Sequence, residues 1–133
     1  LNNVYREHRP AVCWTAQRWA YTSYGISKQM NLEPNQSVYE HPWVSSHLKT
    51  FRKSTIENVK DENFRGEDGE YFKRIGDQTI YLPVLHQAAG NWHYEPIVAY
   101  HYTIDMKPET FQSDDAKFQK YEGEYLRSRG FVS

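Results

Sequence analysis

Asp77 is the side chain of this sequence best placed to carry chemistry, because it opens a predicted helix that continues as an apolar stretch to Gly90. The helix dipole and the free backbone N–H groups of a helix N-terminus stabilise a carboxylate in its charged form. An ionised carboxylate can take a proton from a hydroxyl group while that oxygen attacks another centre. Asp77 is therefore the candidate catalytic base, and the alternative is an ordinary first-turn aspartate.

Three further side chains, Trp43, Ser46 and His47, suit the binding of a carbohydrate. An indole ring can stack on the C–H face of a sugar, while a hydroxyl group and an imidazole can hydrogen-bond to its hydroxyls. The alternative is structural: Trp43 as a hydrophobic staple and Ser46 as the cap of the helix that follows.

Metal ligation is the other chemistry that the composition allows. Structural zinc sites have closely paired ligands, whereas the histidines here are scattered and form no HExxH motif: His47, His86, His93 and His101. The acidic loop could approach a divalent cation or form a solvated turn, and it lacks the calcium-loop pattern; its carboxylates are Glu67, Asp68 and Glu70. The metal ligands therefore stay unknown at the level of sequence.

The composition narrows the class of protein. A chain of 133 residues fits one domain with a real core. The formal net charge of −1 gives no electrostatic reason to expect a nucleic-acid partner. Cys13 is the sole cysteine, which excludes an internal disulfide, and no apolar run approaches the roughly 20 residues of a membrane span. Eleven tyrosines and four tryptophans fit either sugar binding or an aromatic-rich core.

The elements that position these residues follow from local patterns. We expect helix at 1–7, ended near Pro10, then a strand at 11–22, and a surface loop at 23–42 long enough to act as a lid. A helix should follow Ser45 or Ser46, with Lys49, Arg52 and Lys53 on its solvated face and its apolar stripe at Leu48, Phe51, Ile56 and Val59.

The second half of the chain gives clearer signals. An acidic turn is expected at 61–69, and a helix from Asp77 to Gly90 in which Pro83 implies a kink or a later start. A short buried strand should run over 96–103, and a last helix should follow Ser113 and end at Gly130. This order of helices and strands predicts a layered α/β domain.

Several segments together resemble the C-terminal half of the catalytic domain of family 2-type glycosyltransferases, which have the GT-A fold. The similarity covers nearly the whole chain and is carried by LNNVY at the start, HPWVSSHLKTF (41–51), GEDGEYF (66–72), DQTIYLPVLHQAAG (77–90), IVAYHYT (97–103) and EGEYLRSRG (122–130). The resemblance implies an α/β fold, a partial GT-A-like layered domain with few strands and about four helices that spans residues 1–133.

The resemblance also assigns roles. Asp77 occupies the place of the base in the family's "ED" motif, with Gly76 in place of the acidic first member. Trp43, Ser46 and His47 would face the acceptor. The nucleotide-binding half of such enzymes, with its DXD motif, has no counterpart in this chain. We therefore expect the nucleotide-sugar donor and a divalent metal, Mg²⁺ or Mn²⁺, to be held mostly by a missing N-terminal half.

The primary hypothesis is an inverting glycosyltransferase of polysaccharide biosynthesis, which transfers a sugar from a nucleotide-sugar donor to an acceptor hydroxyl. This chain would supply the acceptor side and the base. The alternatives are a non-catalytic carbohydrate-binding or interaction module derived from that fold, and a metal hydrolase that uses the scattered histidines. We expect a cytoplasmic protein, with any membrane attachment made through the rest of the polypeptide.

Overall fold

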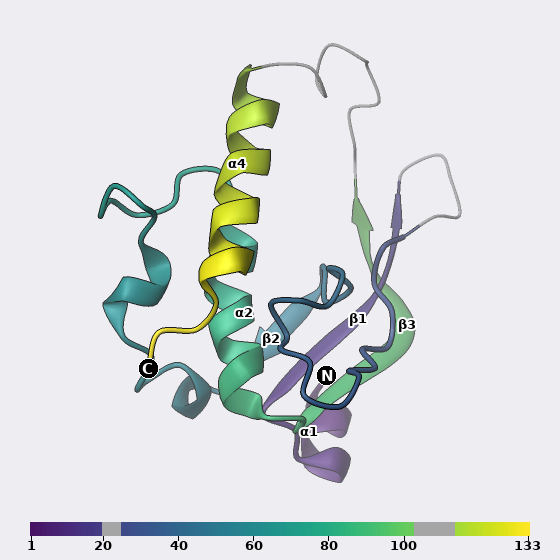
Figure 1. Cartoon of the computed structure of the whole chain (residues 1–133). Helices are drawn as coiled ribbons and strands as arrows, with labels where there is room; N and C mark the ends of the chain where they lie inside the picture. Colours follow the sequence, from purple (N-terminus) through teal and green to yellow (C-terminus); the bar gives the residue numbers. More distant parts are fainter. Residues whose placement is uncertain (20–24, 103–113) are drawn as a thin grey trace.

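A computed structural model describes residues 1–19, 25–102 and 114–133, and within these ranges the chain has a mixed α/β architecture (Figure 1). It contains a three-stranded mixed sheet, three α-helices and two short 3-10 helices. In chain order the elements are α1 (Asn2–His8), β1 (Val12–Trp19), β2 (Lys49–Phe51), η1 (Lys53–Thr55), η2 (Asp61–Phe64), α2 (Gly76–Ala88), β3 (Trp92–Tyr102) and α4 (Asp114–Arg129).

The sheet has the order β2-β1-β3, with β1 in the centre. Strand β2 is antiparallel to β1, with Val12 opposite Phe51, and β3 is parallel to β1, with Val12 opposite Trp92. A parallel pair requires a long crossover connection, and here the crossover includes β2 and α2. The central strand is buried because other elements surround it: Val12, Cys13 and Trp14 are all inaccessible to solvent.

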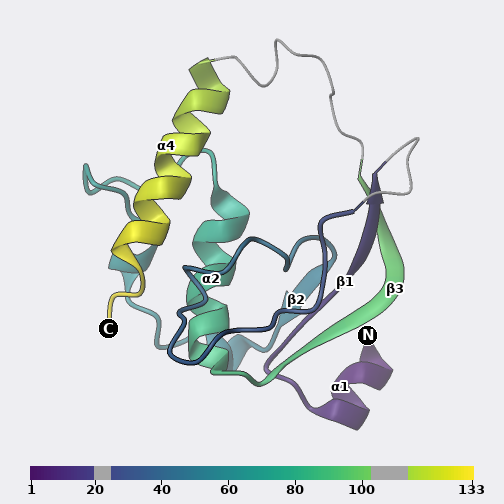
Figure 2. The ribbon, with the colours of Figure 1, turned by 45° about the vertical axis from the view of Figure 1, so that its right-hand side comes forward.

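Helix α2 is the middle layer of the molecule, with the sheet on one side and α4 on the other (Figures 1 and 2). The hydrophobic residues of α2 do not form a single stripe along one face. Residues 81–85 are all buried, as expected for a helix that other elements cover on more than one side. The buried residues of the helix are Thr79, Tyr81, Leu82, Pro83, Val84, Leu85 and Ala88. Leu126 of α4 is fully buried and belongs to the same core as Trp14 of β1.

Two buried aromatic side chains connect the layers through hydrogen bonds. The Tyr81 hydroxyl of α2 donates to the carbonyl oxygens of Cys13 at 3.2 Å and Thr50 at 3.0 Å, and therefore ties the helix to both β1 and β2. The Trp14 indole N–H donates to the Lys28 carbonyl at 2.8 Å. Buried hydroxyl and indole groups need such partners to offset their desolvation.

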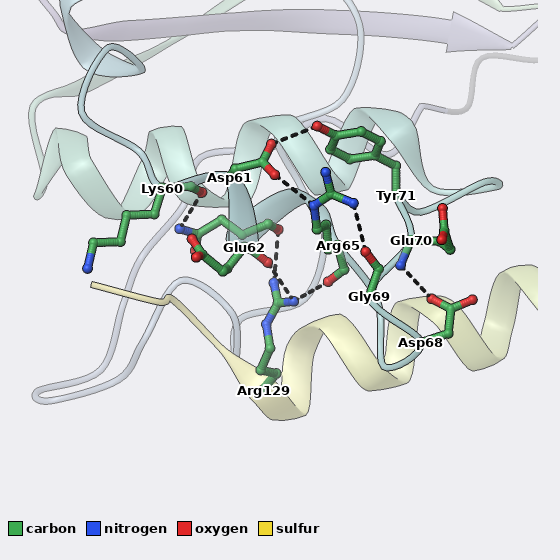
Figure 3. Close-up of polar contacts among 10 residues, drawn as sticks. Lys60, Asp61, Glu62, Arg65, Asp68, Gly69, Glu70, Tyr71 and Arg129 are labelled. Atoms are coloured by element: carbon green, nitrogen blue, oxygen red, sulfur yellow. Dashed lines mark hydrogen bonds and ion pairs between the residues drawn. The ribbon is translucent and has the colours of Figure 1, made fainter.

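The C-terminal end of α4 is held against η2 by a polar network (Figure 3). The Arg129 guanidinium donates to the carbonyl oxygens of Glu62 at 3.1 Å and Asn63 at 2.9 Å, and also to that of Arg65. The buried Asn63 amide in turn donates to the Val132 carbonyl and accepts from the Val132 N–H. Residues far apart in sequence therefore form one bonded unit, which fixes α4 relative to the segment that precedes α2.

Glu122 of α4 fixes the entry of α2. Its carboxylate accepts the backbone N–H of Lys73 and that of Arg74, at distances of 2.7–3.2 Å. These two N–H groups lie just before the helix start at Gly76. Hydrogen bonds to a charged acceptor are stronger than neutral ones, so α4 helps to set where α2, and with it Asp77, begins.

The expected helix after Ser45 or Ser46 is wrong. Residues Lys49–Phe51 form strand β2, followed by the single 3-10 turn η1. The apolar stripe was only roughly periodic, and backbone pairing with β1 overrides it: the Thr50 hydroxyl also donates to the Cys13 carbonyl at 3.2 Å. Ser46 caps no helix, because it is buried and its hydroxyl accepts a hydrogen bond from the Gln17 amide at 2.8 Å.

Strand β3 differs from the short buried strand expected at 96–103. It begins at Trp92, and its middle is open to solvent, with Ile97 65% and Val98 48% exposed. Within the described residues β3 is an edge strand, and its register against β1 shifts at these two residues, between the pairs Thr15–Glu95 and Ala16–Val98. Thr103 itself lies outside the described residues. Pro83 was expected to cause either a kink or a later start of the Asp77 helix. The later start is wrong, because α2 begins at Gly76 and continues through Pro83.

Four expected elements are present where the structure describes them, although the described residues hold three α-helices where about four helices were expected. The predicted N-terminal helix, first strand, Asp77 helix and last helix correspond to α1, β1, α2 and α4. The acidic segment 61–69 forms η2 and a turn. Residues 25–42 of the predicted loop contain no helix or strand, while 23 and 24 lie outside the described ranges. This segment is not a surface loop throughout, because Met30, Val38 and Tyr39 are buried in the hydrophobic core. No α-helix in those ranges is long and apolar enough to cross a membrane.

The different burial of two side chains on α2 predicts that their replacement by alanine lowers the free energy of unfolding by different amounts. Leu85 is fully buried, so Leu85→Ala should lower the free energy of unfolding by roughly 2–5 kcal/mol through lost transfer energy and the cavity left behind. Ile80→Ala is the matched control, because Ile80 is 43% exposed, and it should cost clearly less. Urea denaturation followed by circular dichroism measures both. Equal losses would contradict the assigned burial.

Candidate functional site

Asp77 is the second residue of α2, and its side chain is 37% exposed. Its Oδ1 atom accepts the backbone N–H of Gln78 at 2.9 Å, and its Oδ2 atom faces the ammonium group of Lys49 at 3.7 Å. The carboxylate is therefore neither covered by packed side chains nor isolated on an outer surface. It lies at a helix N-terminus, where the backbone N–H groups and the helix dipole favour the charged form of a carboxylate.

Lys49 is the residue at this site that the sequence reasoning missed, since it was placed on the solvated face of a helix. Its side chain is only 12% exposed. The Nζ atom lies 5.7 Å from the ring centroid of Trp43 and 6.0 Å from that of Tyr81. The strand alternation of HLKTF was the available signal, because β-structure turns successive side chains to opposite faces. Lys49 thereby meets α2 instead of water.

His47 lies close enough to this ion pair to sense both charges. Burial lowers the pKa of the His47 imidazole, the Lys49 ammonium lowers it further, and the Asp77 carboxylate opposes both effects. The ring stacks against Tyr100 of β3, with centroids 5.0 Å apart. With its pKa below the ordinary value, His47 is neutral at neutral pH and can serve as a hydrogen-bonding group at the site.

Trp43 lines an open groove that also includes Gln78, the residue after Asp77, but not Asp77 itself. Its indole is half-buried and meets Tyr81 edge to face, with centroids 6.4 Å apart. The groove is lined by residues of the segment 39–43, of α2 and of α4: Tyr39, Glu40, His41, Pro42, Trp43, Gln78, Glu124, Arg127 and Ser128. An aromatic ring beside amide, hydroxyl and carboxylate groups is a lining that suits an amphipathic ligand such as a sugar.

Arg127 makes one wall of this groove rigid. Its guanidinium donates to the carbonyl oxygens of Tyr39 at 3.0 Å and His41 at 2.8 Å, and to the Gln78 amide oxygen at 3.4 Å. Burial lowers the pKa of this guanidinium, although an arginine stays protonated. Helix α4 thus holds the loop that carries Trp43 at a fixed distance from the start of α2.

Of the predicted site residues, the structure brings Asp77, His47 and Trp43 together around Lys49. Ser46 does not open onto this site, since it is 4% exposed and bonded to Gln17. Gln17 belongs to β1, so this hydrogen bond holds Ser46 against the central strand. Ser46 therefore acts as a support for the site in this conformation and offers no hydroxyl to a ligand.

Metal ligands do not converge in the described part of the chain, where no group of three or more His, Cys, Asp or Glu side chains could hold a metal ion. The histidines have separate environments: His86 stacks on Phe131, and His93 stacks on His8. In the acidic loop, Asp68 accepts the N–H of Glu70 at 2.9 Å, as in an ordinary turn (Figure 3).

Comparison with known proteins gave no match to a protein-family model, to a curated protein or to a solved structure.

The electrostatics of the site predict opposite responses of His47 to two substitutions. Lys49→Met removes a neighbouring positive charge and should raise the pKa of His47, whereas Asp77→Asn removes a negative charge and should lower it further. Shifts of a few tenths of a unit to about one unit are expected. Imidazole NMR titration measures them.

A matched control is Lys53→Met, because Lys53 is 88% exposed and lies near Glu57 instead. It should leave the His47 titration in place. The electrostatic picture of the site would be refuted by shifts of the same sign in Lys49→Met and Asp77→Asn.

Proposed function

We propose that this chain forms the acceptor side of an inverting glycosyltransferase, as the C-terminal portion of a GT-A-like catalytic domain, and that Asp77 is its base. The observation that carries the proposal is the position of the Asp77 carboxylate: it is partly open to solvent, it contacts Gln78 and Lys49, and it precedes Gln78, which lines a groove together with Trp43. The motifs HPWVSSHLKTF and DQTIYLPVLHQAAG, on which the family resemblance depends, contribute the same residues.

The chemistry assigned to the chain is one proton transfer. An acceptor sugar lies in the groove with its ring against the Trp43 indole, and Gln78 and Ser128 offer hydrogen-bonding groups. Asp77 removes the proton of one acceptor hydroxyl while that oxygen attacks the anomeric carbon of the donor. The new glycosidic bond forms as the bond to the nucleoside diphosphate breaks, the configuration inverts, and the proton remains on Asp77.

The donor belongs outside the described residues. The family resemblance implies a divalent cation that would stabilise the leaving diphosphate in the intact enzyme, but the described side chains show no cluster that fits it. We therefore assign donor and metal binding to a separate N-terminal half and place no step of the reaction on a metal held here. A cytoplasmic reaction site, where nucleotide-sugars are available, is part of the same proposal.

Asp77→Asn tests the base assignment. The amide keeps the size of the side chain and cannot accept the acceptor proton, so kcat for sugar transfer by the full-length protein should fall by about 10²–10⁴-fold. The dissociation constant for the nucleotide-sugar, measured by calorimetry, should stay within about twofold because the donor binds elsewhere. Transfer at the wild-type rate would show that Asp77 is not the base.

Asp68→Asn provides the matched control, since Asp68 is an exposed carboxylate remote from the groove of Trp43. It should transfer sugar at the wild-type rate. A loss equal to that of Asp77→Asn would mean that the activity responds to net charge and not to a base at position 77.

A second candidate function is a non-catalytic carbohydrate-binding module. The groove favours it, because Trp43 and the side chains near Arg127 could hold a sugar without any donor site. Calorimetry with oligosaccharides and nucleotide-sugars distinguishes the two functions. Glycan binding that Trp43→Ala abolishes, in a full-length protein that binds no nucleotide-sugar, would favour the module over the transferase.

A further inference from the structure

The ammonium group of Lys49 is a buried cation that the proposed proton transfer does not use. Its Nζ atom has almost no solvent contact and makes no hydrogen bond of normal length. Within the described residues, the carboxylate within ion-pair distance of it is that of Asp77, at 3.7 Å. The charges that face it come from two elements: Asp77 on α2, and the titratable His47 on the segment before β2.

Burial of an ammonium group is costly, and the protein would avoid the cost with an apolar residue at this position. Two features compensate for it here. The faces of Trp43 and Tyr81 give partial cation–π stabilisation, and Asp77 supplies the opposing charge. Burial lowers the pKa of Lys49, while the attraction of Asp77 and the contact with it raise that pKa. The two groups therefore depend on each other.

The geometry restrains the carboxylate in a particular orientation. Oδ1 of Asp77 is held by the backbone N–H of Gln78, and Oδ2 is held by Lys49. The backbone of Lys49 is fixed by the pairing of β2 with β1, and its ammonium group lies near the Trp43 and Tyr81 rings. A base must be held in one productive geometry for rapid proton transfer. Here one oxygen of the carboxylate accepts a hydrogen bond and the other faces a cation at ion-pair distance.

We propose that Lys49 is a positioning residue for Asp77: its buried ammonium orients the carboxylate at the start of α2. This inference rests on the proposed function, in which Asp77 is the base. It assigns Lys49 no contact with the substrate. Its consequence is that sugar transfer needs Lys49 in the protonated form, because the neutral amine no longer holds the Asp77 carboxylate.

The rate of transfer should therefore fall at alkaline pH as Lys49 loses its proton. Arginine does not deprotonate in that range, so Lys49→Arg should retain the charge and move this fall to higher pH. His47 does not account for it, because its pKa is below the ordinary value, and its charge is already lost at neutral pH. Tyr81 does not either, because burial raises the pKa of its hydroxyl.

Steady-state kinetics of the full-length protein from about pH 6 to about pH 10 test this. Lys49→Met should lower kcat by roughly 10–100-fold while KM for the acceptor changes by less than about threefold. Lys49→Arg should restore most of kcat and shift the alkaline fall upward. Wild-type kcat in Lys49→Met, or an unchanged alkaline fall in Lys49→Arg, would overturn the inference, since a residue needed only for packing would not control the pH profile.

An NMR titration of Lys49 tests the inference without an activity measurement, and it applies if the Lys49 variants fold poorly. Carbon-13 NMR of the lysine Cε atoms should show a lower pKa for Lys49 in Asp77→Asn than in the wild type, because the opposing charge is gone. An unmoved Lys49 titration in this variant would overturn the positioning role alone. Wild-type turnover by Asp77→Asn would instead overturn the proposed function, and with it the role of Lys49.

Discussion

The enclosure of α2 between the sheet and α4 is the constraint on which the rest of the structure depends. Three of its side chains make contacts on different sides of the helix. Tyr81 donates hydrogen bonds to carbonyl groups of β1 and β2, Leu85 is fully buried in the core, and the Gln78 amide oxygen accepts from Arg127 of α4. Because the helix is held from both sides, its N-terminus cannot shift without breaking packing on one of them. The position of Asp77 at that N-terminus is a consequence of the core.

The same arrangement explains why the candidate site combines residues from three parts of the chain. β1 is the common partner: it pairs with β2, which carries Lys49, and with β3, which carries Tyr100 against His47. α4 completes the site from the other side, since Arg127 fixes the loop that leads to Trp43. The packed elements already restrict the Lys49 and Asp77 side chains, so formation of the ion pair costs little further conformational entropy. This reduces the total cost of a partly buried ion pair.

Burial and charge attraction have opposite effects on the protonated form of Lys49. Burial of Lys49 lowers its pKa and costs free energy, while Asp77 and two aromatic rings recover part of that cost. Exposed ion pairs, such as Lys53 with Glu57, have no comparable desolvation cost because both groups stay in contact with water. The burial of its ammonium group distinguishes the Lys49 and Asp77 pair from that exposed pair, and this is why the mechanistic proposals centre on it.

The sequence alone determined the elements whose signals are local. The helix at Asp77 with glycine beyond its end, the last helix with its terminal arginines, and the first strand were all predictable, because capping and periodicity are encoded within a few residues. Asp77, Trp43 and His47 were proposed from their chemistry and order, and the structure brings them near one another around Lys49. The tertiary structure decided what depends on distant partners: that 49–51 is a strand, that Ser46 is buried under Gln17, and that Lys49 lies beneath aromatic rings. Strand pairing and the burial of a charge are set by neighbours remote in sequence, and no local pattern records them.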